Sequence, residues 1–213
     1  MTNIFLNIDL FRIINEYIDL RSLCDTCLLL ATLKKYINYK FNKKYSLVYY
    51  NNILFRNFIL SKIFNLNKQL HLNLAICDNI TDVSILANVY TLDLSSCHNI
   101  TSVIALRNIH TLDLSCCYNI TDVSTLANVH TLDLSGCRNI IDVSMLGNVH
   151  TLDLSGCNKI TNVSMLGNVH LLKLSNCQKI TDVSALRNVH TLNLSYCENI
   201  TEVIAENVHL IKN

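Results

Sequence analysis

Seven cysteines recur at intervals of twenty residues along most of the chain. They are Cys77, Cys97, Cys117, Cys137, Cys157, Cys177 and Cys197. Thiols in such a series could bind a metal or form disulfides, but zinc sites use ligands that lie two to four residues apart on each side of the site. One cysteine per repeat instead predicts a column of buried thiols, each donating a weak hydrogen bond to a backbone carbonyl. No metal site is therefore expected, although oxidation could link two neighbours.

A second column of titratable side chains consists mainly of histidines. It runs Tyr90, His110, His130, His150, His170 and His190, with His209 slightly out of phase. Imidazoles titrate near pH 6.5, and closely stacked ones oppose one another's protonation. Two interpretations stay open: a pH-sensitive ladder, or a residue at a solvent-exposed edge that is copied with its repeat.

A third column is acidic. It runs Asp93, Asp113, Asp133 and Asp153, and then continues as Lys173 and Asn193. These residues alternate with leucines, so they face outward from any strand that buries the leucines. Such a column favours a basic or cationic partner, while simple solvation of the carboxylates is the alternative. The coil with Leu171 and Lys173 departs from the others, which makes Lys173 a candidate binding residue.

Two further columns differ from copy to copy. One runs Ser96, Cys116, Gly136, Gly156, Asn176 and Tyr196, and the other runs His98, Tyr118, Arg138, Asn158, Gln178 and Glu198. Both lie just after the expected strand, where loops usually carry recognition. Tyr118, Arg138 and Tyr196 are the candidate partner-binding residues of these columns. The alternative is that the copies differ only because exposed positions tolerate sequence drift.

All these columns follow from one internal repeat of twenty residues. Its pattern is V-x-x-L-x-L-x-x-C-x-x-I-x-x-V-x-x-L-x-N, and apolar columns run from Leu72 to Leu192, from Leu74 to Leu194 and from Ile80 to Ile200. The pattern resembles the leucine-rich-repeat family over about residues 69–210, and the string LxLSxCxxITD resembles its cysteine-containing class. This resemblance implies an α/β solenoid whose parallel sheet forms a concave face. The acidic column would then lie on that face, and Tyr118, Arg138 and Tyr196 at its rim.

Elementary physics agrees with a solenoid. The alternating leucines of TLDLS have the period of a short strand, and NITDVSxLxN places an apolar residue at every third position, as a 3₁₀-like arc does. Seven inward side chains contribute roughly 10–15 kcal/mol per coil, whereas ordering twenty backbones costs roughly 20–40 kcal/mol. A lone coil is therefore unstable, and only stacking of coils stabilises it.

The sequence predicts three parts. Residues 1–48 form a small helical domain, 49–68 an apolar helical connector, and 69–213 seven coils that end in a degenerate C-terminal cap, where Glu206 replaces the expected leucine. Residues 1–68 carry ten Lys and Arg against four Asp and Glu, while residues 69–213 carry seven against twelve. The basic cluster within residues 34–44 is interpreted as a solvated helix face, so no nucleic-acid partner is expected.

The first helices resemble an F-box. The matching or nearby positions are Leu6, Asp9, Leu10, Phe11, Ile14, Ile18, Leu20 and Leu23. Asn7 stands where the family has proline, and the usual tryptophan is missing. The resemblance implies that these residues dock on the Skp-type adaptor of a cullin-based ubiquitin ligase while the repeats hold a substrate. The alternative is a helical cap that only covers the first coil.

No nucleophile–base pair, phosphate-binding glycine loop or cofactor motif is visible, so we expect binding rather than catalysis. We expect no membrane segment and no signal peptide, and hence a cytoplasmic protein. Regular coils in an Asn- and Ile-rich chain also resemble the repeat proteins of large DNA viruses that infect amoebae, which implies action in the host cytoplasm. The two functional hypotheses are a substrate-recruiting F-box adaptor and a plain protein-binding scaffold.

Overall fold

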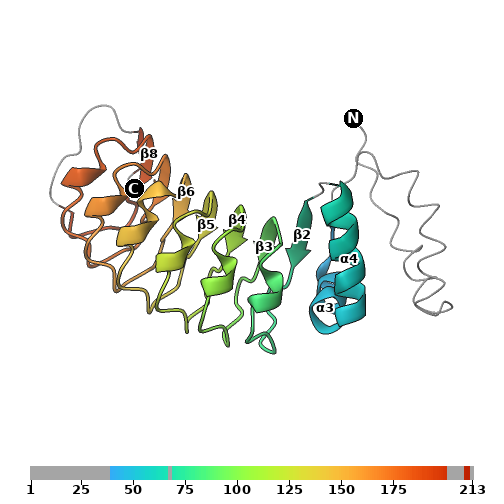
Figure 1. Ribbon diagram of the computed structural model, residues 1–213. Helices are drawn as coiled ribbons and strands as arrows, with labels where there is room; N and C mark the ends of the chain where they lie inside the picture. The colour runs from blue at the N-terminus through green and yellow to red at the C-terminus, as the bar shows by residue number, and fades with distance from the viewer. Residues whose placement is uncertain (1–38, 67–68, 201–208, 212–213) are drawn as a thin grey trace.

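Each coil begins with a short parallel strand, and the strands stack in chain order into one sheet. The computed structural model describes residues 39–66, 69–200 and 209–211, and within them the sheet has nine strands. The strands are β1 (Tyr39–Lys40), β2 (Leu70–Asn73), β3 (Thr91–Asp93), β4 (Thr111–Asp113), β5 (Thr131–Asp133), β6 (Thr151–Asp153), β7 (Leu171–Lys173), β8 (Thr191–Asn193) and β9 (His209–Ile211). The result is a curved solenoid (Figure 1), as the repeat predicted.

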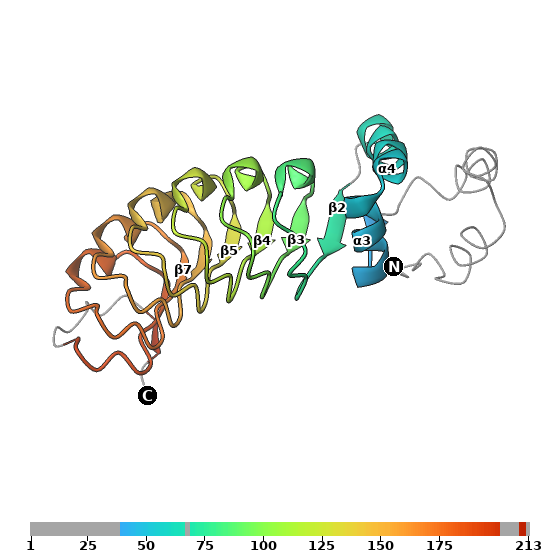
Figure 2. The same cartoon turned by 90° about the horizontal axis from the view of Figure 1, so that it is seen from below.

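The register of the sheet follows directly from the constant repeat length. Leu92 pairs with Leu112, and Leu112 with Leu132, so that equivalent residues lie side by side. Between the strands, backbone hydrogen bonds such as Leu94 N–H to the Asp113 carbonyl, at 2.9 Å, join one coil to the next. Figure 2 shows the strands along the inner side of the arc, which is the concave face that the sequence predicted.

The return arc of each coil contains a short 3₁₀-helix on the outer, convex side, and this confirms the expected geometry. These helices are η1 (Ser84–Leu86), η2 (Ile104–Leu106), η3 (Ser124–Leu126), η4 (Ser144–Asn148), η5 (Ser164–Leu166) and η6 (Ser184–Leu186). In most arcs an Asp or Asn side chain accepts the backbone N–H of the first serine, as Asp122 Oδ1 does from Ser124 N at 2.9 Å. Such a side-chain turn explains why the repeat carries D-V-S at this point.

The interior consists of the predicted apolar columns. Leu92, Leu94, Ile100, Val103 and their equivalents in the other coils are almost fully buried. The cysteine column lies among them, with Cys97 to Cys177 inaccessible to solvent. From Cys97 to Cys197 the thiols donate hydrogen bonds to carbonyls of the preceding coil, as Cys137 Sγ does to Leu114 O at 3.1 Å, whereas Cys77 donates to Ala75 O of its own coil. The prediction of structural thiols is confirmed, and none of the cysteines in the described part of the chain forms a disulfide.

Two helices cover the N-terminal end of this interior. They are α3 (Lys43–Asn51) and α4 (Ile53–Leu66). Each begins with an asparagine cap: Asn42 Oδ1 accepts Tyr45 N at 3.1 Å, and Asn52 Oδ1 accepts Phe55 N at 2.9 Å. Tyr49 and Ile59 are buried in the same cluster as Leu70 and Leu72. The helices therefore close the apolar end that an open coil would expose to water.

The sequence did not predict β1, which lies within residues assigned to a helical domain. The Phe41 N–H that follows it bonds to the His71 carbonyl at 2.9 Å, so this segment extends the sheet by one strand. The predicted border after residue 48 falls inside α3. The F-box-like positions Leu6, Asp9, Leu10, Phe11, Ile14, Ile18, Leu20 and Leu23, and the predicted cap at Glu206, lie outside the described residues. Within the described ranges, no helix is both long and apolar enough to cross a membrane.

Candidate protein-binding surface

The concave face carries the acidic column in the centre of the sheet. Residues at alternate positions of each strand point away from the core, and Thr91 and Asp93 are half-buried while Leu92 between them is buried. In the parallel register the column runs Asp93, Asp113, Asp133, Asp153, Lys173. Four carboxylates therefore lie about 4.8 Å apart, the spacing of neighbouring strands.

Each carboxylate of the acidic column has a structural bond as well as an outward position. Asp113 Oδ1 accepts the backbone N–H of Ser115 at 2.9 Å, and Asp133 Oδ1 accepts that of Ser135 at 2.8 Å. Asn193 makes the same bond to Ser195 N at 2.9 Å, so the turn requires a side-chain oxygen but no charge. The charge of the column is therefore available to a partner.

Both ends of the acidic column accept hydrogen bonds from neighbouring side chains, and only the donor at the Asp153 end is charged. Asn73 Nδ2 donates to Asp93 Oδ2 at 2.8 Å, and Lys173 Nζ lies 3.0 Å from Asp153 Oδ2. The hydrogen bond and charge of Asp153 raise the pKa of Lys173. In the middle, burial raises the pKa of Asp133, and the charges of Asp153 and Asp113 add to this while hydrogen bonds from Ser135 oppose it. A positively charged partner group would therefore stabilise the carboxylates of the central coils most.

One edge of the concave face carries a ladder of contacting side chains from four coils, here called the rim ladder: Asp78, His98, Tyr118 and Arg138. His98 Nδ1 lies 3.0 Å from Asp78 Oδ1, and its ring stacks on Tyr118 with centroids 5.1 Å apart. The guanidinium of Arg138 lies 5.6 Å from the centroid of the same tyrosine ring. A hydrogen bond with Cys116 raises the pKa of Tyr118. The structure thus brings the predicted residues Tyr118 and Arg138 into contact, together with His98 and Asp78.

Tyr196 lies on the same edge but far from the rim ladder. It follows β8, whereas Tyr118 follows β4. Its side chain is 64% exposed, and its carbonyl accepts a hydrogen bond from Gln178 Nε2 at 2.7 Å. A partner that contacts both tyrosines must therefore span the four strand spacings from β4 to β8.

The variable column of Tyr196 has a backbone property that the sequence reasoning missed. Its residues all adopt positive φ: Ile76, Ser96, Cys116, Gly136, Gly156, Asn176 and Tyr196, with values from 56° to 72°. This left-handed conformation favours glycine and tolerates asparagine. The presence of Gly136, Gly156 and Asn176 in the column was the available signal. The non-glycine residues of this column are therefore held in a strained backbone conformation.

The opposite edge carries the histidine ladder, which is His110, His130, His150, His170 and His190. Consecutive rings lie 4.5 to 4.7 Å apart, and Tyr90 stacks on His110 at 4.5 Å. Nδ1 of His130 lies 3.2 Å from Thr131 Oγ1, which orients the ring. The concave face is thus bordered by imidazoles on one side and by the rim ladder on the other. Where side chains are described, no group of three or more His, Cys, Asp or Glu is placed to hold a metal ion.

The fold and this surface define a leucine-rich-repeat solenoid, an architecture that presents an extended surface for binding proteins. Comparisons with solved structures agree. Internalin C2 of Listeria monocytogenes matches with a TM-score of 0.53 and 25% identity over 72% of this chain and 82% of that one. No protein-family profile matches the chain, and no curated protein matches it.

Two longer internalins of the same organism are also similar. Internalin F matches with a TM-score of 0.49 and 26% identity, over 64% of this chain and 44% of that one. A functional domain of InlJ, described as including a cysteine ladder, matches with a TM-score of 0.39 and 21% identity, over 62% of this chain and 36% of that one. This chain spans less than half the length of each of these two proteins.

Proposed function

We propose that this chain acts by binding a basic segment of a partner protein along its concave face, and not by catalysis. The observation that carries the proposal is the acidic column, whose carboxylates stay outward although their structural bonds need only a neutral oxygen. Complementary charge steers association and excludes partners of the same sign. The rim ladder adds Tyr118 and Arg138, two residue types that dominate binding energy at protein interfaces.

The test compares partner capture by two double variants of the full chain. Asp113→Asn/Asp133→Asn removes two charges from the concave face and keeps both serine bonds. Asp82→Asn/Asp182→Asn removes two charges from the convex arcs and keeps the bonds to Ser84 and Ser184. Proteins captured by the wild type and by the convex control, but lost with the concave variant, support the proposal. Equal capture by all three would exclude the concave face as the binding site.

A finer proposal is that the protein recruits a substrate to a cullin-based ubiquitin ligase. It is supported by the resemblance of residues 6–23 to an F-box, and by the position of α3 and α4, which connect that segment to the first coil. We expect the full chain to co-purify with a Skp-type adaptor, and Leu10→Asp to abolish this. Asn15→Asp introduces the same charge outside the matching positions and is the control. If the N-terminal segment is only a cap, Leu10→Asp destabilises the first coils and no adaptor is lost.

We place this function in the cytoplasm, or in the host cytoplasm if the protein is viral. The support is the column of thiols in hydrogen bonds to carbonyls, a chemistry suited to a reducing compartment. A fluorescent fusion of the full chain that is exported rather than retained would contradict this location.

A further inference from the structure

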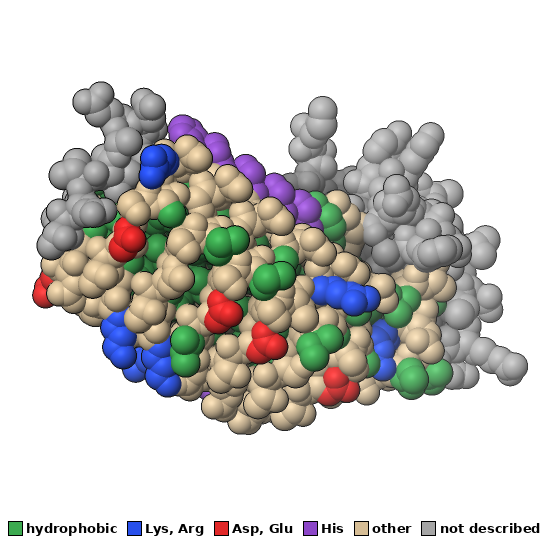
Figure 3. Space-filling view, turned by 60° about the vertical axis from the view of Figure 1, so that its left-hand side comes forward, with side chains coloured by type: hydrophobic (Ala, Val, Ile, Leu, Met, Phe, Trp, Pro, Cys, Tyr) green, Lys and Arg blue, Asp and Glu red, His purple; other side chains and the backbone are tan. Residues whose placement is uncertain are grey.

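The convex face carries an unusual apolar patch, defined here as Ile141, Met145 and Met165. Their side chains are 62%, 57% and 61% exposed. Large hydrophobic side chains that gather on a surface usually mark an interaction site, whereas single ones need no explanation. Figure 3 shows this face, with hydrophobic side chains beside a row of carboxylates that crosses the arcs.

Comparison among the coils shows that the patch is a local departure from the repeat. At the position of Ile141 the other coils carry Thr81, Thr101, Thr121, Thr161 and Thr181. At the position of the two methionines they carry Ile85, Ala105, Thr125 and Ala185. Two residues after each methionine, Gly147 and Gly167 replace Ala87, Arg107, Ala127 and Arg187. On two adjacent coils, therefore, a bulky apolar residue and a glycine appear together where the other coils carry different residues.

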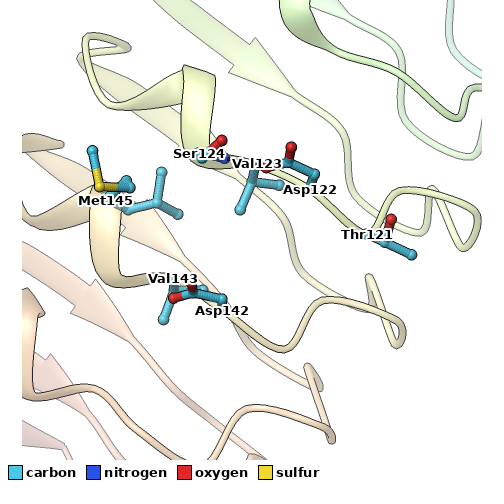
Figure 4. Close-up of a pocket in the computed structure, with 8 residues that line it drawn as sticks. Thr121, Asp122, Val123, Ser124, Asp142, Val143 and Met145 are labelled. Atoms are coloured by element: carbon cyan, nitrogen blue, oxygen red, sulfur yellow. Dashed lines mark hydrogen bonds between the residues drawn. The ribbon is translucent and has the colours of Figure 1, made fainter.

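The patch borders two consecutive grooves. One has a volume of about 260 Å³ and lies between the arc of Thr121–Ser124 and that of Asp142–Leu146. The other, of about 210 Å³, lies between the arc of 141–144 and that of 161–166. They share Asp142 and Val143, so they form one continuous surface. Figure 4 shows the first groove, with Met145 and Asp142 from one coil and Thr121 and Asp122 from the preceding coil.

The polar borders of these grooves are negatively charged. Asp122 and Asp142 occupy neighbouring arcs and belong to the same groove. Hydrogen bonds from the hydroxyl and backbone N–H of Ser124 lower the pKa of Asp122. The backbone N–H and hydroxyl of Ser144 lower that of Asp142, although the charge of Asp122 opposes this. Both carboxylates are thus ionised at neutral pH. An apolar ligand of the grooves would bind more favourably if it also carried positive charges beside its apolar side chains.

We propose that the two grooves bind a basic amphipathic helix of a partner protein, which lies along the solenoid axis. Coils are about 4.8 Å apart at the strands and further apart on the outer side of the arc, while one helical turn rises about 5.4 Å. Apolar side chains at i and i+4 of such a helix therefore meet successive grooves, one per turn. Methionine suits this role because its flexible thioether adapts to different partners. Lys or Arg side chains flanking the apolar stripe would pair with Asp122 and Asp142.

The chain offers a direct spectroscopic probe of this site. Its three methionines are Met1, Met145 and Met165, so labelling of the methionine methyl groups gives three signals, two of them from the patch. The ligand is a synthetic helical peptide of about 18 residues with leucine at i and i+4 and flanking lysines, compared with the same peptide carrying glutamates instead. We expect the lysine peptide to shift the Met145 and Met165 signals and to bind about tenfold more tightly than the glutamate peptide.

Three variants distinguish binding at the patch from nonspecific apolar binding and from binding at the concave face. Ile141→Thr/Met145→Thr/Met165→Ala restores residues found in other coils. It should lower the affinity for the lysine peptide by about tenfold or more, while the melting temperature of the protein stays unchanged. Ile104→Ser removes a 63% exposed isoleucine on another arc and should leave binding intact. Asp113→Asn/Asp133→Asn should also bind the peptide normally, which distinguishes this site from the concave face.

Three results would overturn the proposal. They are equal affinity for the lysine and glutamate peptides, unchanged binding to the restored triple variant, and shifts of the Met145 and Met165 signals with protein concentration alone. The last result would assign the patch to contact between two copies of the chain.

Discussion

The thiol of Cys117 donates a hydrogen bond to the backbone carbonyl of Leu94 in the preceding coil, with Sγ and O 3.2 Å apart. The same bond recurs from Cys97 to Leu74 and from Cys157 to Leu134. The Leu94 carbonyl also accepts the backbone N–H of Cys97 at 3.1 Å, so the thiol uses its second lone pair and links two coils. The cysteine column therefore has a structural role: its thiols stabilise the stacking of coils and are not reactive groups.

Thiol reactivity should differ sharply between two adjacent residues. Burial raises the pKa of Cys117 to about 12, and only the thiolate reacts with alkylating agents. Cys116 is partly exposed at the surface. We expect iodoacetamide at pH 8 to modify Cys116 in the native protein, and Cys117 and Cys137 only after unfolding. Peptide mapping by mass spectrometry measures this, with Cys116→Ser as the control. Native Cys117 that reacts as fast as Cys116 would refute the buried ladder.

The left-handed backbone position predicts a stabilising substitution. Ile76 has φ of 57° and is 69% exposed, so its β-branched side chain adds strain while burying little surface. Asn176 occupies the equivalent position, and asparagine tolerates this conformation. We expect Ile76→Asn to raise the free energy of unfolding by about 1 kcal/mol. Ile141→Asn, at a residue that is 62% exposed but outside the positive-φ positions, should change it by less than about 0.5 kcal/mol. Urea denaturation gives both values, and an unchanged or lower stability of Ile76→Asn would contradict the strain.

The constant period made most of the fold predictable from the sequence. Once coils of twenty residues stack in register, every apolar residue in a column has the same environment, so the core, the thiol bonds and the 3₁₀-helices follow. The position of the acidic column on the concave face follows for the same reason.

Features without a repeat signal were missed. β1 pairs with β2 through Tyr39 and Lys40, which lie before the first coil and match no column. At the left-handed position the two glycines and the asparagine gave only a weak signal, because Ile, Ser, Cys and Tyr occupy it in the other coils. The apolar patch escaped notice because it is visible only as a departure of adjacent coils from their neighbours.

The end of the acidic column predicts a charge effect at Lys173. Lys173→Asp would place a fifth carboxylate beside Asp153, whereas Lys173→Asn would imitate Asn193. Like charges directly opposite on neighbouring strands destabilise a sheet, so we expect Lys173→Asp to be less stable than Lys173→Asn by about 0.5–1 kcal/mol. Because the site is partly exposed, 1 M NaCl should remove most of this difference. A difference that persists in high salt would show that packing, and not charge, distinguishes the two variants.

The histidine ladder predicts that stability falls in mild acid. Loss of solvation, and then the neighbouring imidazoles, lower the pKa of His130 and His170 in the folded protein. Between the lowered pKa and the unfolded value of about 6.5, the unfolded chain binds more protons than the native one. The contribution of the ladder is therefore complete above about pH 6.5 and is lost as the pH falls from there through the lowered pKa of the folded protein.

We expect the urea midpoint to be lower at pH 5.5 than at pH 7.5, and the double variant His130→Gln/His170→Gln to show a smaller drop. The carboxylates of Asp82 and Asp182 do not obscure this interval. Hydrogen bonds to Ser84 and Ser184 lower the pKa of Asp82 and Asp182, so their stabilising effect is lost only below about pH 4. If the wild type has the same midpoint at both pH values, the stacked rings 4.6 Å apart do not oppose each other's protonation. The histidines would then be residues at a solvent-exposed edge that are copied with each repeat and have no role in pH sensing.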